Sequence, residues 1–449
     1  MGGLFGTDGI RGEANRYPMD VMTAFSVGQA VSHLLSKKRA RPRIVLGRDT
    51  RLSGPMIQSA LTAGIISMGG DPCPAGVLPT PGIALITSRN GADAGIVISA
   101  SHNPYQDNGI KIFSGSGFKL TDAQEEEVEG LILGNRLQEM VPHSSRLGRP
   151  FDLEDAAGQY ISFLGETFPR DLSMAGMKIV LDTANGATYK VAPETFSRLG
   201  ADVEVIHDQP DGLNINEGCG SQYTRDLEEK VLASRASLGL AFDGDGDRLI
   251  AVDEKGHKLT GDQILIICAR SLKEQGRLKN NLVVSTVMSN LGLRLACRKL
   301  GFRYQASRVG DRYVLEDMLK GGAVVGGEDS GHMIFLEHHT TGDGIIASLQ
   351  LISAMIRQDR PLSELAAMMD LFPQRLVNVE VKRKPAIETV PEIVQAIRQV
   401  ESELGDQGRV LVRYSGTQSM CRVMVEGPTD NLAEAYCRQI AEAVQSALC

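Results

Sequence analysis

Apolar runs long enough for one strand alternate three times with longer stretches of helical periodicity. This alternation is typical of βαβ units, in which helices join parallel strands. The expected strands are residues 43–47, 94–98, 177–182, 238–242, 282–285 and 323–325, and the expected helices are residues 55–68, 187–199 and 291–300. The three stretches share an order of elements rather than a sequence repeat. We therefore predict three topologically similar α/β domains with mixed, mostly parallel sheets.

The last part of the chain, from about residue 374, has a different order of elements. The expected elements are a strand at 377–381, a helix at 387–404, strands at 410–412 and 422–425, and a helix at 431–448. We expect the two later strands to pair antiparallel, which indicates a small α+β domain. Because 449 residues are too many for one core, we place the domains at 1–150, 151–253, 254–372 and 373–449.

Composition and charge restrict the class of protein. The formal net charge of -8 argues against nonspecific binding of nucleic acid. The first residues lack the layout of a signal peptide, and no apolar run approaches the roughly 18 residues that span a bilayer. The seven cysteines are scattered and form no CxxC pair, so they indicate free thiols in a reducing compartment. We expect a cytoplasmic protein with neither a membrane nor a nucleic acid as partner.

Polar loops follow the last expected strand of each α/β stretch. They are residues 99–104 (SASHNP), 243–248 (DGDGDR) and 326–332 (GGEDSGH), and the C-terminal domain offers residues 413–417 (RYSGT) between its two short strands. Ligands of parallel α/β sheets bind beyond the carboxyl ends of the strands. These loops are therefore the candidate functional segments.

The loop at 243–248 carries three carboxylates, Asp243, Asp245 and Asp247, within five residues. Such carboxylates repel one another unless a cation holds them, and their hard oxygens favour Mg²⁺ or Ca²⁺. An EF-hand is one alternative, since Glu254 stands at position twelve, but Arg248 replaces the required glycine and the flanks resemble strands. A solvated acidic turn is the other alternative. We favour a catalytic divalent-metal site.

Ser101 lies in the loop at 99–104 without the surroundings of a hydrolase nucleophile. His102 is its neighbour, but side chains adjacent in sequence usually point apart, and no G-x-S-x-G motif surrounds the serine. A serine can instead carry a phosphate, whose charge a metal ion and Lys111 on the next strand would balance. The alternative is a turn that only ends a strand.

Three further groups of residues suit a phosphosugar. Ser415 and Thr417 hydroxyls, the backbone around Gly416 and the guanidinium groups of Arg413 and Arg422 suit a phosphate dianion, although an ordinary hairpin explains the segment as well. Glu328, Ser330 and His332 suit sugar hydroxyls or a plain polar turn. Arg11, in a glycine-rich segment, is either an anion clamp or part of a flexible terminus.

Taken together, these segments resemble the α-D-phosphohexomutase superfamily over the full length of the chain. The resemblance is carried by residues 5–12 (FGTDGIRG), 47–51 (GRDTR), 99–104, 243–248, 327–332 and 413–417, in that order. Residues 211–221 (DGLNINEGCGS) resemble the phosphoglucosamine branch rather than the phosphomannomutase branch. Tyr414, Gln418 and Ser419 replace the usual Pro, Glu and Pro, which predicts a looser phosphate loop. Asp329 replaces a neutral residue and would either favour an ammonium-bearing sugar or face solvent.

The resemblance implies a role for each candidate residue. Ser101 would be the phosphoserine, and its phosphate together with Asp243, Asp245 and Asp247 would hold Mg²⁺. Arg11 and Lys111 would stabilise the transferring group, with His102 and Arg248 as further catalytic candidates. Sugar and distal phosphate would be bound by Glu328, Ser330, His332, Arg413, Ser415, Gly416, Thr417 and Arg422. The four domains would surround a central cleft.

The implied reaction interconverts glucosamine 6-phosphate and glucosamine 1-phosphate through a 1,6-bisphosphate, which also serves as activator. Its product would supply UDP-N-acetylglucosamine for the cell wall, and members of the family are often homodimers. The alternatives are a phosphomannomutase or phosphoglucomutase, a phosphatase with a phosphoserine intermediate, and a phosphosugar-binding regulator that has lost catalysis.

Overall fold

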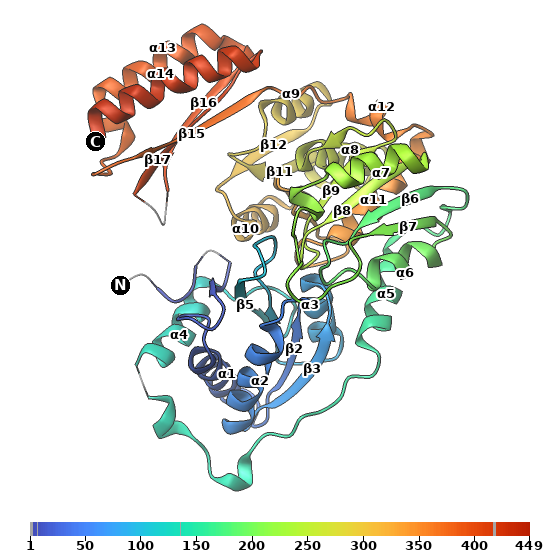
Figure 1. Cartoon of the computed structure of the whole chain (residues 1–449), viewed down its shortest axis with the longest axis vertical. Coiled ribbons are helices and arrows are strands. Elements are labelled where there is room, and N and C mark those ends of the chain that lie inside the picture. Colours follow the sequence, from blue (N-terminus) through green and yellow to red (C-terminus); the bar gives the residue numbers. More distant parts are fainter. Residues whose placement is uncertain (1–2, 7, 135, 416–418) are drawn as a thin grey trace. The chain divides into compact units, whose positions relative to one another are not determined.

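The computed structural model describes residues 3–6, 8–134, 136–415 and 419–449 (Figure 1). The chain forms two compact units. The first unit contains Met1–Val287 and Phe302–Ala367, and the second contains Met288–Gly301 and Met368–Cys449. The first unit holds three sheets and the second holds one.

The three sheets of the first unit repeat one strand order. They run β1-β5-β4-β2-β3, β10-β9-β8-β6-β7 and β12-β11-β13-β14. Their strands are β1 (Ile10–Glu13), β2 (Arg43–Arg48), β3 (Asp71–Val77), β4 (Ala94–Ile98), β5 (Asp107–Ser114), β6 (Lys178–Asp182), β7 (Asp202–Ile206), β8 (Leu238–Phe242), β9 (Leu249–Asp253), β10 (Lys258–Leu259), β11 (Leu282–Thr286), β12 (Arg303–Ser307), β13 (Val325–Gly327) and β14 (Met333–Phe335).

In each sheet three parallel strands are followed by an antiparallel one. Thus β2 pairs with β3 and β4 in parallel, whereas β5 runs antiparallel to β4. The second and third sheets repeat this arrangement with β6 to β9 and with β11 to β14. The predicted threefold topology is confirmed. In the first two sheets, however, antiparallel pairs are as frequent as parallel ones, because β1 and β10 add a further antiparallel edge.

Helices cover these sheets. They are α1 (Val21–Ser36), α2 (Gly54–Ser67), α3 (Thr80–Arg89), α4 (Asp122–Leu133), α5 (Ala156–Thr167), α6 (Val191–Arg198), α7 (Arg225–Ser234), α8 (Gly261–Glu274), α10 (Asp311–Gly321), α11 (Gly344–Gln358) and α12 (Leu362–Ala366). α6 starts at Val191 rather than at residue 187, because residues 187–190 form turns. α8 begins with a capping box in which the Thr260 side chain accepts from the Gln263 backbone N–H.

The helix pair α1 and α2 shows how tightly this unit packs. A Cβ on Gly28 would lie 2.4 Å from the Leu61 carbonyl oxygen, and one on Gly64 would lie 2.1 Å from the Phe25 carbonyl oxygen. Only glycine allows the two backbones to approach this closely. Around this contact, the first core joins side chains of α1 and α2 to those of β2, β4 and β5.

The second unit is an antiparallel sheet packed against helices. Strands β15 (Gln374–Glu380), β17 (Met420–Glu426) and β16 (Arg409–Tyr414) follow in that order, and all pairs are antiparallel. Helices α13 (Pro391–Leu404) and α14 (Asp430–Leu448) lie side by side along the sheet (Figure 1). This confirms the predicted α+β domain. α13 begins at Pro391 rather than at residue 387, because proline suits the first turn of a helix.

Helix α9 (Leu291–Lys299) belongs to the second unit, although it lies between β11 and β12 in the chain. The Leu291 N–H donates to Glu426 Oε2 at 2.8 Å, and Glu426 also pairs with Arg409 at 2.7 Å. The domain boundaries at 150, 253 and 372 stay predictions. The second sheet runs slightly past residue 253, since β10 pairs with β9.

Candidate active site

Ser101 lies just beyond the carboxyl end of β4 in a backbone conformation that serine seldom adopts. Its φ is 53°, and only 1% of the residue is exposed. Its carbonyl oxygen accepts hydrogen bonds from Arg51 Nη2 and from Asn216 Nδ2, both at 2.9 Å. These bonds hold a strained turn of the kind found at functional sites.

Arg51 is itself held rigidly beneath the serine loop. It is fully buried, pairs with Asp49 at 3.0 Å, and donates to the carbonyl oxygens of Asn103 and Pro104 at 2.9 and 3.1 Å. Asp49 Oδ2, which pairs with Arg51, also accepts a hydrogen bond from the Ser99 hydroxyl at 2.6 Å. Because Arg51 and Asp49 are both buried and bind several atoms of the loop, the pair favours one conformation of the loop.

The three aspartates of residues 243–248 lie in the turn between β8 and β9. One carboxylate oxygen of each aspartate lies within 4.8 Å of one oxygen of each of the other two, and all three side chains are buried. Because strands flank the loop, the EF-hand alternative is wrong, and because the loop is buried, so is the solvated turn. The Ser101 hydroxyl donates to Asp243 Oδ2 at 2.5 Å. The serine and the acidic cluster therefore meet, as predicted.

Lys111 on β5 supplies a buried positive charge to this cluster. It is 2% exposed, and its Nζ lies 2.9 Å from Asp245 Oδ2, 3.4 Å from Asp247 Oδ2 and 3.2 Å from Asp8 Oδ2. Burial disfavours the charged amine, but the three carboxylates outweigh it and raise the pKa of Lys111 well above its usual value.

Nearby positive charges do not balance the carboxylate of Asp243. Burial, together with Asp247 and Asp245, raises the pKa of Asp243 well above its usual range. Asp245 Oδ1 and Asp247 Oδ1 are buried and have no hydrogen-bond partner among the described residues. Clustered carboxylates with free oxygens fit a hard divalent cation such as Mg²⁺.

Two arginines and a histidine surround the serine and the acidic loop. Arg11 Nη1 donates to the Ala100 carbonyl at 3.0 Å, and Arg248 Nε lies 3.9 Å from Asp247 Oδ1. His102 Nδ1 is 3.3 Å from Ser101 Oγ, so this neighbour in sequence does face the serine, unlike the usual case. Burial, then Arg248 and Arg11, lowers the pKa of His102 to about 4. The imidazole is therefore neutral near pH 7.

The predicted sugar-binding segment follows β13 and adjoins the acidic loop through His332. Its Nδ1 lies 3.6 Å from Asp247 Oδ2 and its Nε2 lies 3.5 Å from Asp311 Oδ2. Glu328 Oε1 accepts from the Gly310 N–H at 3.0 Å, and Ser330 is exposed. Asp329 Oδ1 is buried without a hydrogen-bond partner in the described parts of the chain, so this carboxylate does not simply face solvent.

The predicted phosphate loop belongs to the second unit. Arg413 on β16 and Arg422 on β17 are direct cross-strand partners, and burial followed by Arg422 lowers the pKa of Arg413. Like charges in such a pair destabilise a sheet unless an anion joins them. Arg422 Nε is buried and has no hydrogen-bond partner within the described ranges. Ser415 follows β16, whereas Gly416 and Thr417 lie outside the described residues.

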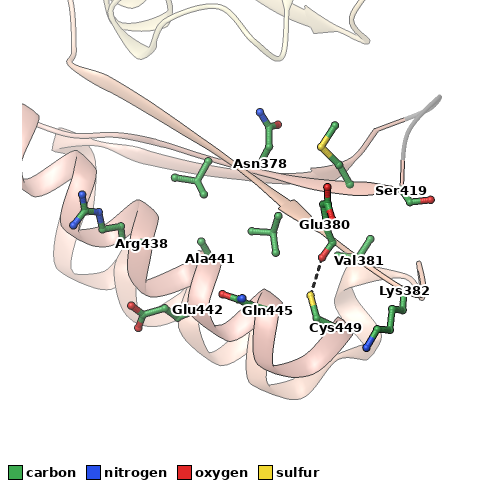
Figure 2. A pocket seen from close by; sticks show the side chains of 13 residues that line it. Asn378, Glu380, Val381, Lys382, Ser419, Arg438, Ala441, Glu442, Gln445 and Cys449 are labelled. Atoms are coloured by element: carbon green, nitrogen blue, oxygen red, sulfur yellow. Dashed lines mark hydrogen bonds between the residues drawn. The ribbon is translucent and has the colours of Figure 1, made fainter.

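A hollow of about 860 Å³ in the second unit does not contain these groups (Figure 2). It lies between β15 and α14, where the Cys449 thiol donates to the Glu380 carbonyl at 2.7 Å. None of the predicted site residues lines it, so we assign it no part in the site.

Sequence reasoning missed several residues of the site. Asp8 contacts Lys111 and Lys119, and Thr80 donates to Asp245 Oδ2 at 2.6 Å. Asp8, Arg51 and Asn216 lie within segments 5–12, 47–51 and 211–221, which the resemblance had already marked. Thr80 and Lys119 stand in segments without a comparable pattern.

Models of four successive domains of one protein family match the chain in their order along the family's sequence. Alpha/beta/alpha domains I, II and III of phosphoglucomutase/phosphomannomutase match residues 2–139, 159–256 and 260–372, and the C-terminal domain matches residues 376–443. The chain belongs to the phosphoglucomutase/phosphomannomutase family. The predicted resemblance to phosphohexomutases is confirmed.

Relatives in this family match the chain from end to end. A phosphoglucosamine mutase of Syntrophobacter fumaroxidans is 66% identical over 448 residues, which cover 100% of both chains. Another, of Syntrophotalea carbinolica, is 52% identical and covers 98% of this chain and 97% of its own. Both carry the name of the branch that residues 211–221 predict.

Solved structures confirm the family's fold. A phosphoglucomutase/phosphomannomutase family protein of Burkholderia thailandensis has a TM-score of 0.80 at 22% identity, covering 98% of this chain and 97% of its own. The N-acetylphosphoglucosamine mutase of Aspergillus fumigatus, solved with GlcNAc-6P and magnesium, has a TM-score of 0.71 at 18% identity, covering 99% and 96%. Among the described helices, none is long and apolar enough to cross a membrane.

Proposed function

We propose that the chain is a phosphoglucosamine mutase that interconverts glucosamine 6-phosphate and glucosamine 1-phosphate. The observation that carries the proposal is the 2.5 Å hydrogen bond from the Ser101 hydroxyl to Asp243 in a buried cluster of three aspartates. A serine in that place can carry a phosphoryl group beside a divalent cation. The 66% identity to a phosphoglucosamine mutase supports this choice of substrate.

In the proposed reaction, Ser101 starts as a phosphoserine. The substrate's 1-hydroxyl attacks the phosphorus, the bond from phosphorus to Ser101 Oγ breaks, and the hydroxyl proton passes by way of His102 to Ser101 Oγ. The resulting 1,6-bisphosphate turns around. Ser101 Oγ then attacks the 6-phosphate, the proton returns to the sugar oxygen, and glucosamine 1-phosphate leaves. The same bisphosphate would restore the phosphoserine when it is lost.

The residues around Ser101 suit this phosphoryl transfer. Bound Mg²⁺ would neutralise charge on the phosphoryl group, with Asp243, Asp245 and Asp247 as its protein ligands. Lys111 and Arg11 lie where they can stabilise the phosphoryl oxygens. His102, neutral and 3.3 Å from Ser101 Oγ, can take up and return the proton, with Arg248 beside it.

Two further groups would hold the rest of the substrate. We assign Glu328, Ser330 and His332 to the sugar hydroxyls. The phosphate that is not reacting would be bound by Arg413, Ser415, Gly416, Thr417 and Arg422. The cross-strand pair of Arg413 and Arg422 supports this assignment. A cytoplasmic location and a role in supplying UDP-N-acetylglucosamine accord with this substrate.

The test starts from the purified protein, Mg²⁺, a trace of glucose 1,6-bisphosphate and glucosamine 6-phosphate. We expect glucosamine 1-phosphate to form, and intact-mass spectrometry to find one phosphate that is absent from Ser101→Ala. Faster reaction of glucose or mannose phosphates would instead favour a phosphoglucomutase or phosphomannomutase. Release of inorganic phosphate as fast as isomerisation would favour a phosphatase, and no turnover of any phosphosugar would contradict the mutase.

A further inference from the structure

A second cluster of possible metal ligands lies at the carboxyl edge of the second sheet. Asp182 ends β6, His207 directly follows β7, and Cys219 comes from the loop before α7. A carboxylate oxygen, an imidazole nitrogen and the thiol sulfur of these residues lie within 4.8 Å of one another. Asp182 and Cys219 are buried, and the His207 side chain is 24% exposed. None of the three belongs to the acidic loop at 243–248.

His207 is oriented so that one ring nitrogen faces this cluster. Nδ1 lies 3.1 Å from Asp182 Oδ1, and Nε2 lies 3.3 Å from Asp226 Oδ2. Although Nδ1 is buried and close to Asp182, it has no aligned hydrogen-bond partner among the residues described. The φ of His207 is 52°, a left-handed conformation that histidine adopts more readily than most residues. A carboxylate on the outer nitrogen is the usual support for a histidine that binds a metal through the inner one.

We propose that Asp182, His207 and Cys219 bind one Zn²⁺ ion. The donors would be a carboxylate oxygen, neutral imidazole Nδ1 and a thiolate, and the thiol proton of Cys219 would pass to solvent on binding. This mixed set suits tetrahedral Zn²⁺, with water as the fourth ligand, and does not suit Mg²⁺, which prefers oxygen. The site is therefore chemically distinct from the three-aspartate cluster.

The proposed ion would join three segments that support the serine loop. The Gly220 N–H donates to Asp182 Oδ2 at 2.8 Å, and the Asn216 N–H donates to the Ala184 carbonyl at 2.9 Å. Asn216 in turn donates to the Ser101 carbonyl. Binding at Cys219 and His207 would restrict the loop between them, which carries Asn216. We expect the metal to stabilise the fold rather than to enter the reaction.

Cobalt substitution tests the proposal because Co²⁺ bound to a thiolate absorbs in the near ultraviolet. The full-length protein is freed of metal with a chelator, saturated with Mg²⁺ to fill the acidic cluster, and titrated with Co²⁺. We expect a thiolate-to-cobalt band that saturates at one Co²⁺ per chain. It should disappear in Cys219→Ser and weaken at least tenfold in apparent affinity in His207→Ala. It should persist in Cys268→Ala, which changes a buried cysteine of α8, and in Asp243→Asn.

Two results would overturn the site. The first is the absence of the band in the wild-type protein, which would leave His207 as a plain ion-pair partner of Asp182 and Asp226. The second is an unchanged band in Cys219→Ser. If Cys219→Ser does not fold, the wild type and His207→Ala are compared by thermal unfolding instead. At saturating Mg²⁺, Zn²⁺ should raise the melting temperature of the wild type by clearly more than that of His207→Ala. An equal rise in both contradicts the proposal.

Discussion

At the residue scale, the position of Ser101 depends on atoms of distant segments. Its carbonyl is held by Arg51 and Asn216, and its hydroxyl reaches Asp243. The neighbouring Gly244 leaves room for these contacts: a Cβ there would lie 2.7 Å from the Ser101 carbonyl oxygen and 2.8 Å from Asn216 Nδ2. Because Gly244 has no Cβ, the serine loop and the acidic loop can approach each other this closely.

We expect Gly244→Ala to lower kcat by roughly 100-fold, because a displacement of about 1 Å can cost that much in a positioned reaction. KM should change little, since a Cβ at residue 244 would meet Ser101, Asn216 and Ile215 rather than residues of the sugar segment. Steady-state kinetics of the isomerisation measure both. Gly130→Ala is the control, because a Cβ there meets no described atom within 4 Å. Equal kcat in both variants would show that Gly244 does not set the distance.

Lys111→Met should uncover the repulsion among the aspartates. Removing one partner of a buried ion pair typically costs about 3–5 kcal/mol, so the melting temperature in chelator should fall. Mg²⁺ should then raise the melting temperature of the variant more than that of the wild type, because it replaces the missing charge beside Asp245 and Asp247. Thermal unfolding at matched ionic strength measures this. A smaller rise in the variant would argue against the acidic cluster as the metal site.

At the scale of elements, the first turn of α3 joins loops from three sheets. Thr80, its first residue, bonds Asp245, and the Pro81 carbonyl lies 3.0 Å from His339 Nε2 in the segment after β14. The Thr340 N–H donates to His339 Nδ1 at 2.8 Å. With Nδ1 accepting, Nε2 must carry the proton and donate to Pro81. This arrangement requires a neutral imidazole.

His339 should therefore make stability sensitive to acid. Burial, with a smaller contribution from the nearby His338, lowers its pKa from 6.5 to about 4. Between those values the unfolded chain binds more protons than the folded chain, so stability falls as the pH falls through this window. The shift corresponds to about 3 kcal/mol lost by pH 4.

Urea unfolding from pH 7 to pH 4 measures this effect. His339→Gln keeps a donor for Pro81 but does not titrate, so its stability should fall less steeply than that of the wild type. The exposed His143→Gln serves as the control and should follow the wild-type curve. Parallel curves for His339→Gln and the wild type would contradict the assignment.

At the scale of the whole molecule, each unit has a hydrophobic core of its own. Ile57 is buried in the core formed with α1, α2 and the first sheet, and Ile393 is buried in the core between α13, α14 and the antiparallel sheet. Separate cores allow separate unfolding.

We expect Ile57→Ala and Ile393→Ala to affect different unfolding transitions. Truncating a buried isoleucine to alanine costs about 2–5 kcal/mol. Ile393→Ala should lower the transition of the second unit and expose it to limited proteolysis, while the phosphate on Ser101 is retained. Ile57→Ala should lower the transition of the first unit. Scanning calorimetry with mass analysis of the fragments distinguishes them. If both variants shift one shared transition, the units unfold together.

Much of the architecture follows from local patterns. β4, α2, α9 and β8 lie where apolar periodicity predicts them, and the polar loops after β4 and β8 meet as expected. Differences arise where turns take the place of expected helix, as at residues 187–190 before α6. The antiparallel edge strands β1 and β10 were also missed, since a short strand at an edge has little periodicity of its own.

The sequence by itself determined the order of elements in the three α/β stretches, the C-terminal α+β domain, and the residue types in the acidic loop and the serine loop. These features are local, because they depend on the periodicity of apolar residues and on turn residues. Only the tertiary structure decided which groups meet. Ser101 and Asp243 are 142 residues apart, and Lys111 and Asp245 are 134 apart. Contacts over such distances depend on how packed sheets bring their loop ends together, which no local pattern encodes. The same holds for Asp182, His207 and Cys219, whose separate positions in the chain show no metal-binding spacing.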